Sequence, residues 1–261
     1  MANIDRTPAG NFVWLELATT DQEAAKRFYG ELFGWAAQDF PMGENAVYTM
    51  FSLNGRLTGA TFTLSEPERA AGLPPHWQLY IAVDNADVTA QRAKELGASA
   101  VHAPFDVMSF GRMAVFQDPT GAFFSVWQAR DHKGIGVWGE NGALCWADLM
   151  TQDRDRATAF YGSLFGWEFT TGKGKDAGGY LHILNGQHGV GGMPPSGSVP
   201  PGVRPHWMAY IQCADCEATT AKATGMGARV LMPATRIEGQ LTYSVIADPE
   251  GAVIALFTPG H

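Results

Sequence analysis

The chain has little cysteine and little positive charge, and both shortages narrow the classes of protein that fit it. Only 3 cysteines occur in 261 residues, which excludes the disulfide framework of small secreted proteins. Lysine and arginine number 18 against 26 acidic residues, and the formal net charge is −8. An acidic chain without basic runs binds a phosphate backbone poorly, so we expect no nucleic-acid partner.

Long apolar runs are also lacking from the sequence. No stretch reaches the roughly 20 residues that a membrane-spanning helix needs. The segment from Met1 to Asn11 lacks the apolar core of a signal peptide. We therefore expect no membrane partner and a cytoplasmic location. The hydrophobic share of 46% and the charged share of 17% are those of an ordinary globular protein.

Two of the cysteines, Cys213 and Cys216, have the spacing of a redox pair at an expected strand-to-helix junction. A helix N-terminus at that place could lower a thiol pKa. The flanking residues are not thioredoxin-like, and the matching residues of the first half are Val83 and Ala86. The sequence alone therefore favours two small structural residues over a redox site.

What the sequence does contain is one set of short blocks that occurs twice in the same order. The offset between the copies is nearly constant along the chain, from Phe28 and Phe160 near the start to Asp118 and Asp248 near the end. An offset this steady indicates one domain copied in tandem, because a repeat period reports the structural unit. The repeated blocks are Phe28-Tyr29-Gly30, Leu32-Phe33-Gly34-Trp35, His76-Trp77, Gly97-Ala98 and Asp118-Pro119-Thr120-Gly121.

The local patterns predict a strand, a helix and further strands in each repeated segment. Residues 12–17 alternate apolar and polar side chains, as a half-buried strand does. Thr20 and Glu23 fit a capping box that opens a helix, and Gly34 ends it. Strands are predicted at 47–53, 57–64, 77–83, 112–117 and 122–127, and a second helix at 87–96. Gly178-Gly179 and the Lys173–Lys175 run predict a mobile loop before Tyr180.

Each half therefore holds two such units, and the whole chain holds four. The units span about 12–64, 76–128, 144–194 and 206–258. We expect a first domain at residues 10–128, a linker at 129–143 and a second domain at 144–258. A proline-containing linker is expected at 65–75. Helices that lie on one side of mostly antiparallel strands define an α+β fold.

These blocks resemble the vicinal oxygen chelate superfamily, which includes glyoxalases, bleomycin-resistance proteins and dioxygenases. The resemblance covers nearly the whole chain and rests on the Phe-Tyr and Leu-Phe-Gly-Trp blocks, Val83-Asp84 and the Asp-Pro-x-Gly turn. It implies two tandem glyoxalase-like domains, in which four βαβββ units form curled mixed sheets that enclose cavities. Enzymes of this superfamily usually bind one divalent metal through His, Glu or Gln.

The resemblance also assigns the positions at which those enzymes carry their metal ligands. It places the first ligand at Trp14 and Trp146, the second at Gln78 and Met208, and the third at Ser125 and Ala255. Trp, Met and Ala cannot supply the donors that a divalent cation needs. We therefore expect degenerate metal sites and no cofactor. A metal held by Glu16 and His76, after a two-residue change of register, stays as an alternative.

Two carboxylates, Glu16 and Asp148, are the candidate catalytic residues. Each follows its tryptophan by two residues, so it shares a strand face with that tryptophan. A carboxylate on an enclosed apolar face acquires a raised pKa and can act as a general base. The alternative is a structural ion pair with Arg112 or Arg236. The further candidates for ligand binding are Trp14, His76, Gln78, Ser125, Trp146, His182, His206 and Met208.

Several of these candidates also have a structural interpretation. His76 and His206 follow prolines, so each could bond to the backbone at the start of its strand. Trp14 and Trp146 could plug their cavities or form a stacking wall for a flat ligand. The Phe-Tyr and Phe-Gly-Trp blocks are expected to pack helix against sheet.

Three functions compete on this sequence. The first is a protein that binds a small aromatic or hydrophobic molecule in an aromatic-lined cavity. The second is a lyase, isomerase or hydroxylase-like enzyme that uses Glu16 or Asp148 as base, either without metal or with an unconventional one. The third is a structural protein whose cavities the tryptophans fill. The sequence fits a monomer or a homodimer.

Overall fold

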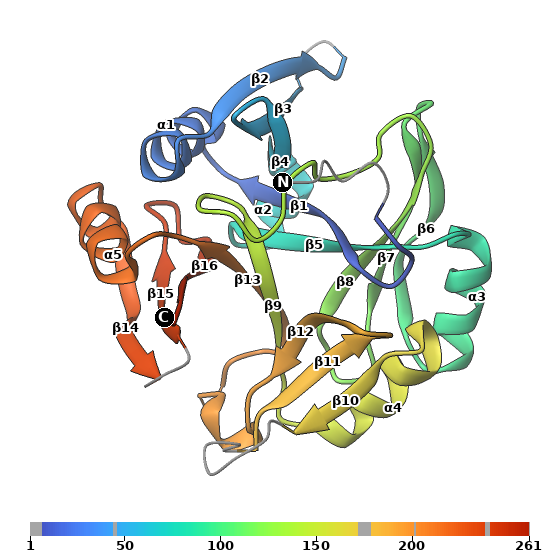
Figure 1. Cartoon of the computed structure of the whole chain (residues 1–261). Coiled ribbons are helices and arrows are strands. Elements are labelled where there is room, and N and C mark those ends of the chain that lie inside the picture. Colours follow the sequence, from blue (N-terminus) through green and yellow to red (C-terminus); the bar gives the residue numbers. More distant parts are fainter. Residues whose placement is uncertain (1–6, 44–45, 172–178, 201, 238–240, 261) are drawn as a thin grey trace.

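The computed structural model describes residues 7–43, 46–171, 179–200, 202–237 and 241–260 (Figure 1). The loop predicted around Lys173–Lys175 and Gly178 lies outside the described residues. The first half contains β1 (Phe12–Thr19), α1 (Gln22–Phe33), β2 (Ala36–Pro41), β3 (Val47–Leu53), β4 (Arg56–Thr63), α2 (Glu66–Ala70), β5 (His76–Ala82), α3 (Ala86–Glu95), β6 (Ser99–Val107), β7 (Gly111–Gln117) and β8 (Phe123–Ala129).

The second half repeats this order with small changes. It contains β9 (Leu144–Met150), α4 (Arg154–Phe165), β10 (Glu168–Thr171), β11 (Leu181–Asn185), β12 (His188–Met193), a 3₁₀ turn (Ser196–Ser198), β13 (His206–Gln212), α5 (Cys216–Gly225), β14 (Arg229–Ile237), β15 (Leu241–Ala247) and β16 (Val253–Pro259). The four βαβββ units predicted from the sequence are therefore present.

Each half forms one open, mixed sheet of 8 strands. The order is β2-β3-β4-β1-β5-β8-β7-β6 in the first half and β10-β11-β12-β9-β13-β16-β15-β14 in the second. The two units of a half join through one antiparallel pair, β1 with β5 and β9 with β13. Within each unit the first and last strands pair in parallel. The predicted α+β fold, with two tandem copies of one domain, is confirmed.

The first helix begins one residue later than the predicted capping box. Asp21 is the N-cap, and its side chain accepts a hydrogen bond from the amide of Ala24 at 2.8 Å. The hydroxyl of Thr20 instead donates to Glu250 in the second half. Gly34 ends the helix in a left-handed conformation with φ 76°, as predicted. The expected linker at 65–75 contains the short helix α2, which begins after Ser65.

The two halves meet through an aromatic core built from the repeated blocks. Phe124 on β8 contacts the rings of Phe160 and Tyr161 on α4. Trp35 donates its indole N–H to the carbonyl of Gly142 at 2.6 Å, and Trp167 donates to the carbonyl of Gly10 at 2.8 Å. The prediction that these blocks form core is therefore confirmed. Among the described residues, no helix is long and apolar enough to cross a membrane.

Candidate functional site

The candidate residues of the first half share one face of the sheet. In the antiparallel pair of β1 and β5, Trp14 lies opposite Tyr80, and Glu16 lies opposite Gln78. Residues opposite one another in a sheet project from the same face. The side chain of Trp77, which precedes Gln78 on β5, projects from the opposite face and contacts Tyr29 on α1. We call the face of Trp14 and Glu16, which points away from α1, the inner face.

Glu16 is held on the inner face by two tyrosine hydroxyls. Its Oε1 accepts a hydrogen bond from Tyr48 at 2.6 Å, and its Oε2 accepts one from Tyr80 at 2.5 Å. The indole N–H of Trp14 donates to the hydroxyl oxygen of Tyr48 at 3.0 Å. Glu16 keeps a partly exposed surface, whereas Trp14 and Tyr80 are buried. Trp14, Glu16, Tyr48 and Tyr80 thus form a connected group, which we call the first quartet.

The second half contains the same four-residue arrangement around Asp148. Its Oδ1 accepts hydrogen bonds from Tyr180 at 2.6 Å and Trp146 at 3.0 Å, and its Oδ2 accepts one from Tyr210 at 2.8 Å. The N–H of Trp146 also lies 2.7 Å from the hydroxyl of Tyr180. We call Trp146, Asp148, Tyr180 and Tyr210 the second quartet. The duplication has therefore preserved a carboxylate that accepts hydrogen bonds from two tyrosines, with a tryptophan beside them.

Burial raises the pKa of both carboxyls above their ordinary values. For Glu16, loss of solvent is the largest cause, and the hydroxyls of Tyr48 and Tyr80 oppose it by stabilising the anion. For Asp148, loss of solvent again dominates over the hydrogen bonds from Tyr180, Tyr210 and Trp146. A carboxyl with a raised pKa is the state that a general base or a strong hydrogen-bond acceptor needs.

The two inner faces differ beyond their quartets. In the first half, the amide of Gln78 donates to the hydroxyl of Ser125, so two polar side chains lie beside Glu16. In the second half, Met208 and Ala255 occupy the matching positions and pack with Tyr210 and Val245 in a separate apolar cluster. Asp148 is only 4% exposed. The first inner face is therefore the more polar of the two, and its carboxylate residue is the less buried.

A histidine that the sequence did not single out lies against the first quartet. His132 follows β8, and its ring meets Trp14 edge-to-face with centroids 4.4 Å apart. The ring of Trp127 also contacts it, with centroids 5.7 Å apart. The Nε2 atom of His132 is buried and has no hydrogen-bond partner among the described residues. Burial lowers the pKa of His132 to about 4, so the ring is neutral at neutral pH.

The three histidines that the sequence predicted lie in two kinds of place: at backbone carbonyls and beside the second quartet. The Nδ1 atoms of His76 and His206 lie 2.9 Å from the carbonyls of Pro74 and Arg204, at the starts of their strands. This is the structural interpretation that the preceding prolines indicated. His182 instead lies beside the second quartet, with its ring centroid 5.0 Å from Tyr180 and 6.2 Å from Trp146.

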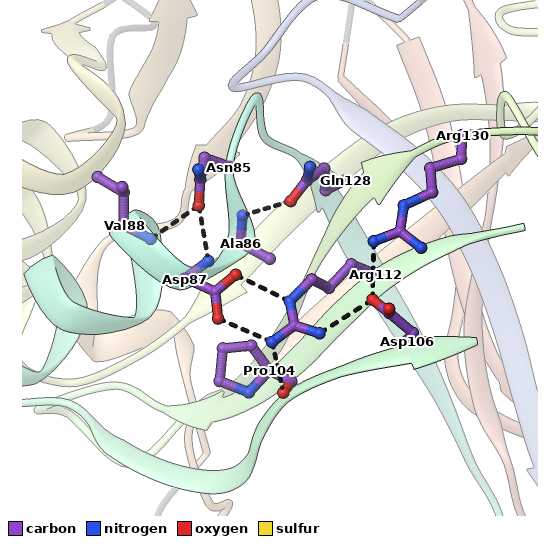
Figure 2. A network of polar contacts seen from close by, with 9 residues as sticks. All are labelled: Asn85, Ala86, Asp87, Val88, Pro104, Asp106, Arg112, Gln128 and Arg130. Atoms are coloured by element: carbon purple, nitrogen blue, oxygen red, sulfur yellow. Dashed lines mark hydrogen bonds and ion pairs between the residues drawn. The ribbon is translucent and has the colours of Figure 1, made fainter. Parts of the chain in front are cut away.

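The alternative of an ion pair between Glu16 and Arg112 is wrong. Arg112 faces the opposite way, where its guanidinium donates to both carboxylate oxygens of Asp87 at 2.8 Å and to Asp106 at 2.9 Å (Figure 2). Arg130 also donates to Asp106, at 2.9 Å. No salt bridge of the described residues joins Arg236 to Asp148. Hydroxyl groups, and not cations, are therefore the main partners of both carboxylates.

The residues at the positions that the resemblance assigns to metal ligands do not fit a divalent cation. Trp14, Trp146, Met208 and Ala255 offer no suitable donor. Gln78 donates its amide to Ser125, so this pair is already engaged. Within the described part of the chain, no cluster of three His, Cys, Asp or Glu side chains has a geometry that could hold a metal. Glu16 is also bonded to two tyrosines, and a metal site made of Glu16 and His76 would have only two donors, one fewer than the three that such a site needs.

The four tyrosines are the main feature of the site that sequence reasoning missed. Tyr48 and Tyr180 are separated by the same offset as Phe28 and Phe160, and Tyr80 and Tyr210 by the same offset as Asp118 and Asp248. Comparing single residues at those offsets would have found them.

No comparable pattern marks His132. It lies in the linker between the two copies, outside both repeated segments. A residue outside the repeat leaves no signal in the duplication.

A separate cavity of about 320 Å³ lies where the N-terminal segment, the linker and β12 meet. Its lining includes Phe12, Ile135, Trp138, His188 and Val190. None of the predicted site residues is among these, so the cavity is distinct from both quartets.

The fold and its duplication agree with comparison to known proteins. The family model described as the glyoxalase/bleomycin resistance protein/dioxygenase superfamily matches residues 11–126 and again residues 143–256. The two matches cover most of the chain, so the protein belongs to this superfamily.

Two relatives align along nearly the whole chain. CFP32 of Mycobacterium tuberculosis, which carries the provisional name glyoxylase, is 37% identical over 249 residues, covering 94% of both chains. The anthracycline biosynthesis protein DnrV of Streptomyces peucetius is 32% identical over 262 residues, covering 95% of this chain and 92% of DnrV.

Solved structures share the fold at low sequence identity. The Mn(II)-bound glyoxalase of Novosphingobium aromaticivorans gives a TM-score of 0.64 at 15% identity, covering 97% of this chain and 83% of that one. The 2,3-dioxygenase LapB of Pseudomonas sp. KL28 gives a TM-score of 0.63 at 12% identity, covering 98% and 94%. At such identities the likeness concerns the fold alone.

Proposed function

We propose that the protein binds a small, flat aromatic molecule that carries a hydroxyl group, on the inner face of the first half. The observation that carries this proposal is the first quartet. It holds a carboxyl group with a raised pKa within an aromatic surround, in a residue that keeps a partly exposed surface. Aromatic walls bury a flat ligand, and a single polar acceptor fixes its orientation.

The hydrogen-bonding capacity of Glu16 favours a ligand that donates. A carboxylate offers about four acceptor positions, and Glu16 uses two of them for Tyr48 and Tyr80. In the first quartet, the indole N–H of Trp14 donates to Tyr48 and not to the carboxylate of Glu16. Glu16 therefore retains capacity for a ligand hydroxyl.

The second quartet supports binding less well. Asp148 accepts three hydrogen bonds and is 4% exposed. Met208 and Val245 pack against the same inner face. We assign the second quartet a structural role that holds the sheet together.

The similarity to DnrV supports an aromatic ligand, because the name of that relative places it in anthracycline biosynthesis. The donor set at the metal positions supports binding without a metal, since it does not fit a divalent cation.

A catalytic role for Glu16 is the second candidate, and the raised pKa favours it. A partly exposed Glu16 could remove a proton from carbon next to a carbonyl group. The provisional name of CFP32 supports enzymatic activity of this kind. Exchange of 2-tetralone protons in heavy water, followed by proton NMR, distinguishes the two functions. Catalysis predicts exchange that the wild type accelerates and Glu16→Gln abolishes, and binding alone predicts none.

Isothermal titration with two matched probes tests the binding proposal. The first probe, 2-naphthol, has a hydroxyl donor, and the second, 2-methoxynaphthalene, has the same ring without one. We expect the wild type to bind 2-naphthol about tenfold more tightly, since a hydrogen bond to a charged group contributes about 1.5–3 kcal/mol.

Variants of the two halves complete this test. Glu16→Gln should remove the preference for 2-naphthol, and Asp148→Asn should keep it. Equal affinity of the wild type for both probes would contradict a role for the Glu16 acceptor. The same loss in both variants would contradict the assignment to the first half.

A further inference from the structure

The cavity of about 320 Å³ lies where the two halves meet, outside both quartets. Its walls come from three segments: the residues around the start of β1, the linker that follows β8, and the start of β12. Phe12, Ile135 and Val190 are buried and make these walls apolar. Small-molecule sites span about 300–1,000 Å³. The cavity is therefore large enough for a molecule of one or two aromatic rings.

The cavity has a counterpart in the first half, which the duplication locates. Pro8 corresponds to Glu140, because the carbonyl of each accepts a hydrogen bond from the amide three residues further on, at 3.1 and 2.9 Å. His188 corresponds to Arg56, because each is the first residue of the strand that follows a two-residue hairpin turn. Both pairs are separated by the offset that relates α1 to α4.

In the first half, an ion pair closes the corresponding place. The guanidinium of Arg56 donates to both carboxylate oxygens of Glu140, at 2.8 and 2.6 Å. This two-bond contact is the strong geometry for such a pair. In the second half, Pro8 has no carboxylate, and the side chain of His188 has no hydrogen bond or ion pair within the described part of the chain. The cavity therefore lies where the chain lacks a carboxylate.

A second unused donor belongs to the same lining. Seven of the 8 tryptophans donate their indole N–H to a described acceptor, whereas the N–H of Trp138 has no partner among the described residues. An indole N–H can only donate, and a neutral imidazole such as that of His188 donates through one nitrogen. No Asp or Glu is among the described residues that line the cavity. An apolar cavity with two unused donors favours an apolar ligand that carries an acceptor.

We propose that this cavity binds a small, flat aromatic molecule that carries a carboxylate. The ring packs against the apolar walls, and the carboxylate accepts hydrogen bonds from Trp138 and His188 in place of the missing glutamate side chain. His188 is exposed, so the carboxylate at this end keeps contact with water and avoids the cost of a buried charge. The ligand differs from that of the first inner face, where the carboxylate of Glu16 disfavours an anion. This inference does not depend on the proposed function.

Isothermal titration with two matched probes tests the class of ligand. The first probe, 2-naphthoate, carries the carboxylate, and the second, 2-acetylnaphthalene, has the same ring with a neutral acceptor. We expect the wild type to bind 2-naphthoate about tenfold more tightly, because hydrogen bonds to a charged acceptor are about twice as strong as neutral ones. Equal affinity for both probes, or no binding of 2-naphthoate, overturns the proposal.

The indole signals of the full-length protein locate the site. A nitrogen–proton correlation spectrum separates the indole N–H signals of the 8 tryptophans, and Trp138→Phe identifies that of Trp138. We expect 2-naphthoate to shift the Trp138 signal the most. The proposal is overturned if this signal stays in place while that of Trp14 or Trp146 moves. Trp138→Phe keeps an aromatic ring and should bind 2-naphthoate about tenfold more weakly.

Variants that carry the first-half residues complete the test. His188→Arg alone should tighten the binding of 2-naphthoate, since a guanidinium binds a carboxylate through two bonds. His188→Arg combined with Pro8→Glu should lose it, because the chain then supplies the carboxylate itself, as Glu140 does. His102→Ala, which removes an exposed histidine of β6, is the control and should bind like the wild type. Thermal unfolding checks that each variant is folded, and a folded double variant with wild-type affinity overturns the proposal.

Discussion

The hydroxyl of Tyr29 donates a hydrogen bond of 2.8 Å to Asp248, which belongs to the other half of the molecule. Its repeat, Tyr161, donates to Asp118 at the same distance in the opposite direction. Trp77 and Trp207 donate to the two tyrosine oxygens at 3.0 and 2.9 Å. The repeated blocks thus join the halves reciprocally, and each copy completes the other.

Removing one of these hydroxyls should destabilise the whole molecule. Tyr29→Phe leaves the carboxylate of Asp248 short of a buried donor, and we expect a loss of about 1–3 kcal/mol in the free energy of unfolding. Tyr161→Phe should cost a similar amount. Urea denaturation followed by circular dichroism measures both. Tyr243→Phe is the control, and an equal loss in that variant would show that the interdomain bonds are not the cause.

Asp148→Asn should change how stability depends on pH. The folded pKa of Asp148 is raised above its ordinary value of 3.8, so the folded state binds a proton more readily than the unfolded state. Wild-type stability should therefore fall as pH rises from about 4 through the folded pKa. The asparagine variant should lack this fall, because it has no carboxyl group that titrates at this position. Parallel pH profiles for the two proteins would contradict the raised pKa.

His132→Phe should stabilise the protein. The variant keeps the edge-to-face contact with Trp14 and removes a buried nitrogen that has no partner among the described residues; such a group costs about 1–3 kcal/mol. The lowered pKa of His132, about 4 against 6.5, means that the wild type loses stability as pH falls between these values. The variant should not show this loss. Thermal unfolding at pH 7 and pH 4.5 checks both effects, and a destabilised variant at pH 7 would indicate an unrecognised partner.

Arg112→Gln should have a small, salt-dependent effect. Arg112 contacts Asp87 and Asp106 in an exposed network (Figure 2), and exposed ion pairs contribute little to stability. We expect a small loss of stability at low salt that shrinks in concentrated sodium chloride, because salt screens exposed charges. Denaturation at the two salt concentrations measures it. A loss that salt does not change would place the network in the core.

The duplication made most of the fold predictable from sequence. Strands such as β1 and β5 alternate between a helix-packed face and the inner face, so their polar and apolar side chains alternate as well. The edge strands β2 and β6 were not predicted, since β2 is exposed along its whole length and β6 along most of it. A strand with no buried face leaves no periodic signal.

The candidate site was predictable only in part. The parity of β1 placed Trp14 and Glu16 on one face, because side chains alternate along a strand. The tyrosines come from other strands, and only the folded sheet brings Tyr48 and Tyr80 to the two oxygens of Glu16. The contact of His132 with Trp14 depends on the path of the linker, which no local pattern encodes.

A crystal structure of the protein with 2-naphthol tests the central claim most directly, because it locates the ligand without assuming which half binds. The account predicts density on the inner face of the first half, with the naphthol hydroxyl within hydrogen-bond distance of Glu16. Density only beside Asp148, or only in the cavity lined by Phe12 and Trp138, would contradict it.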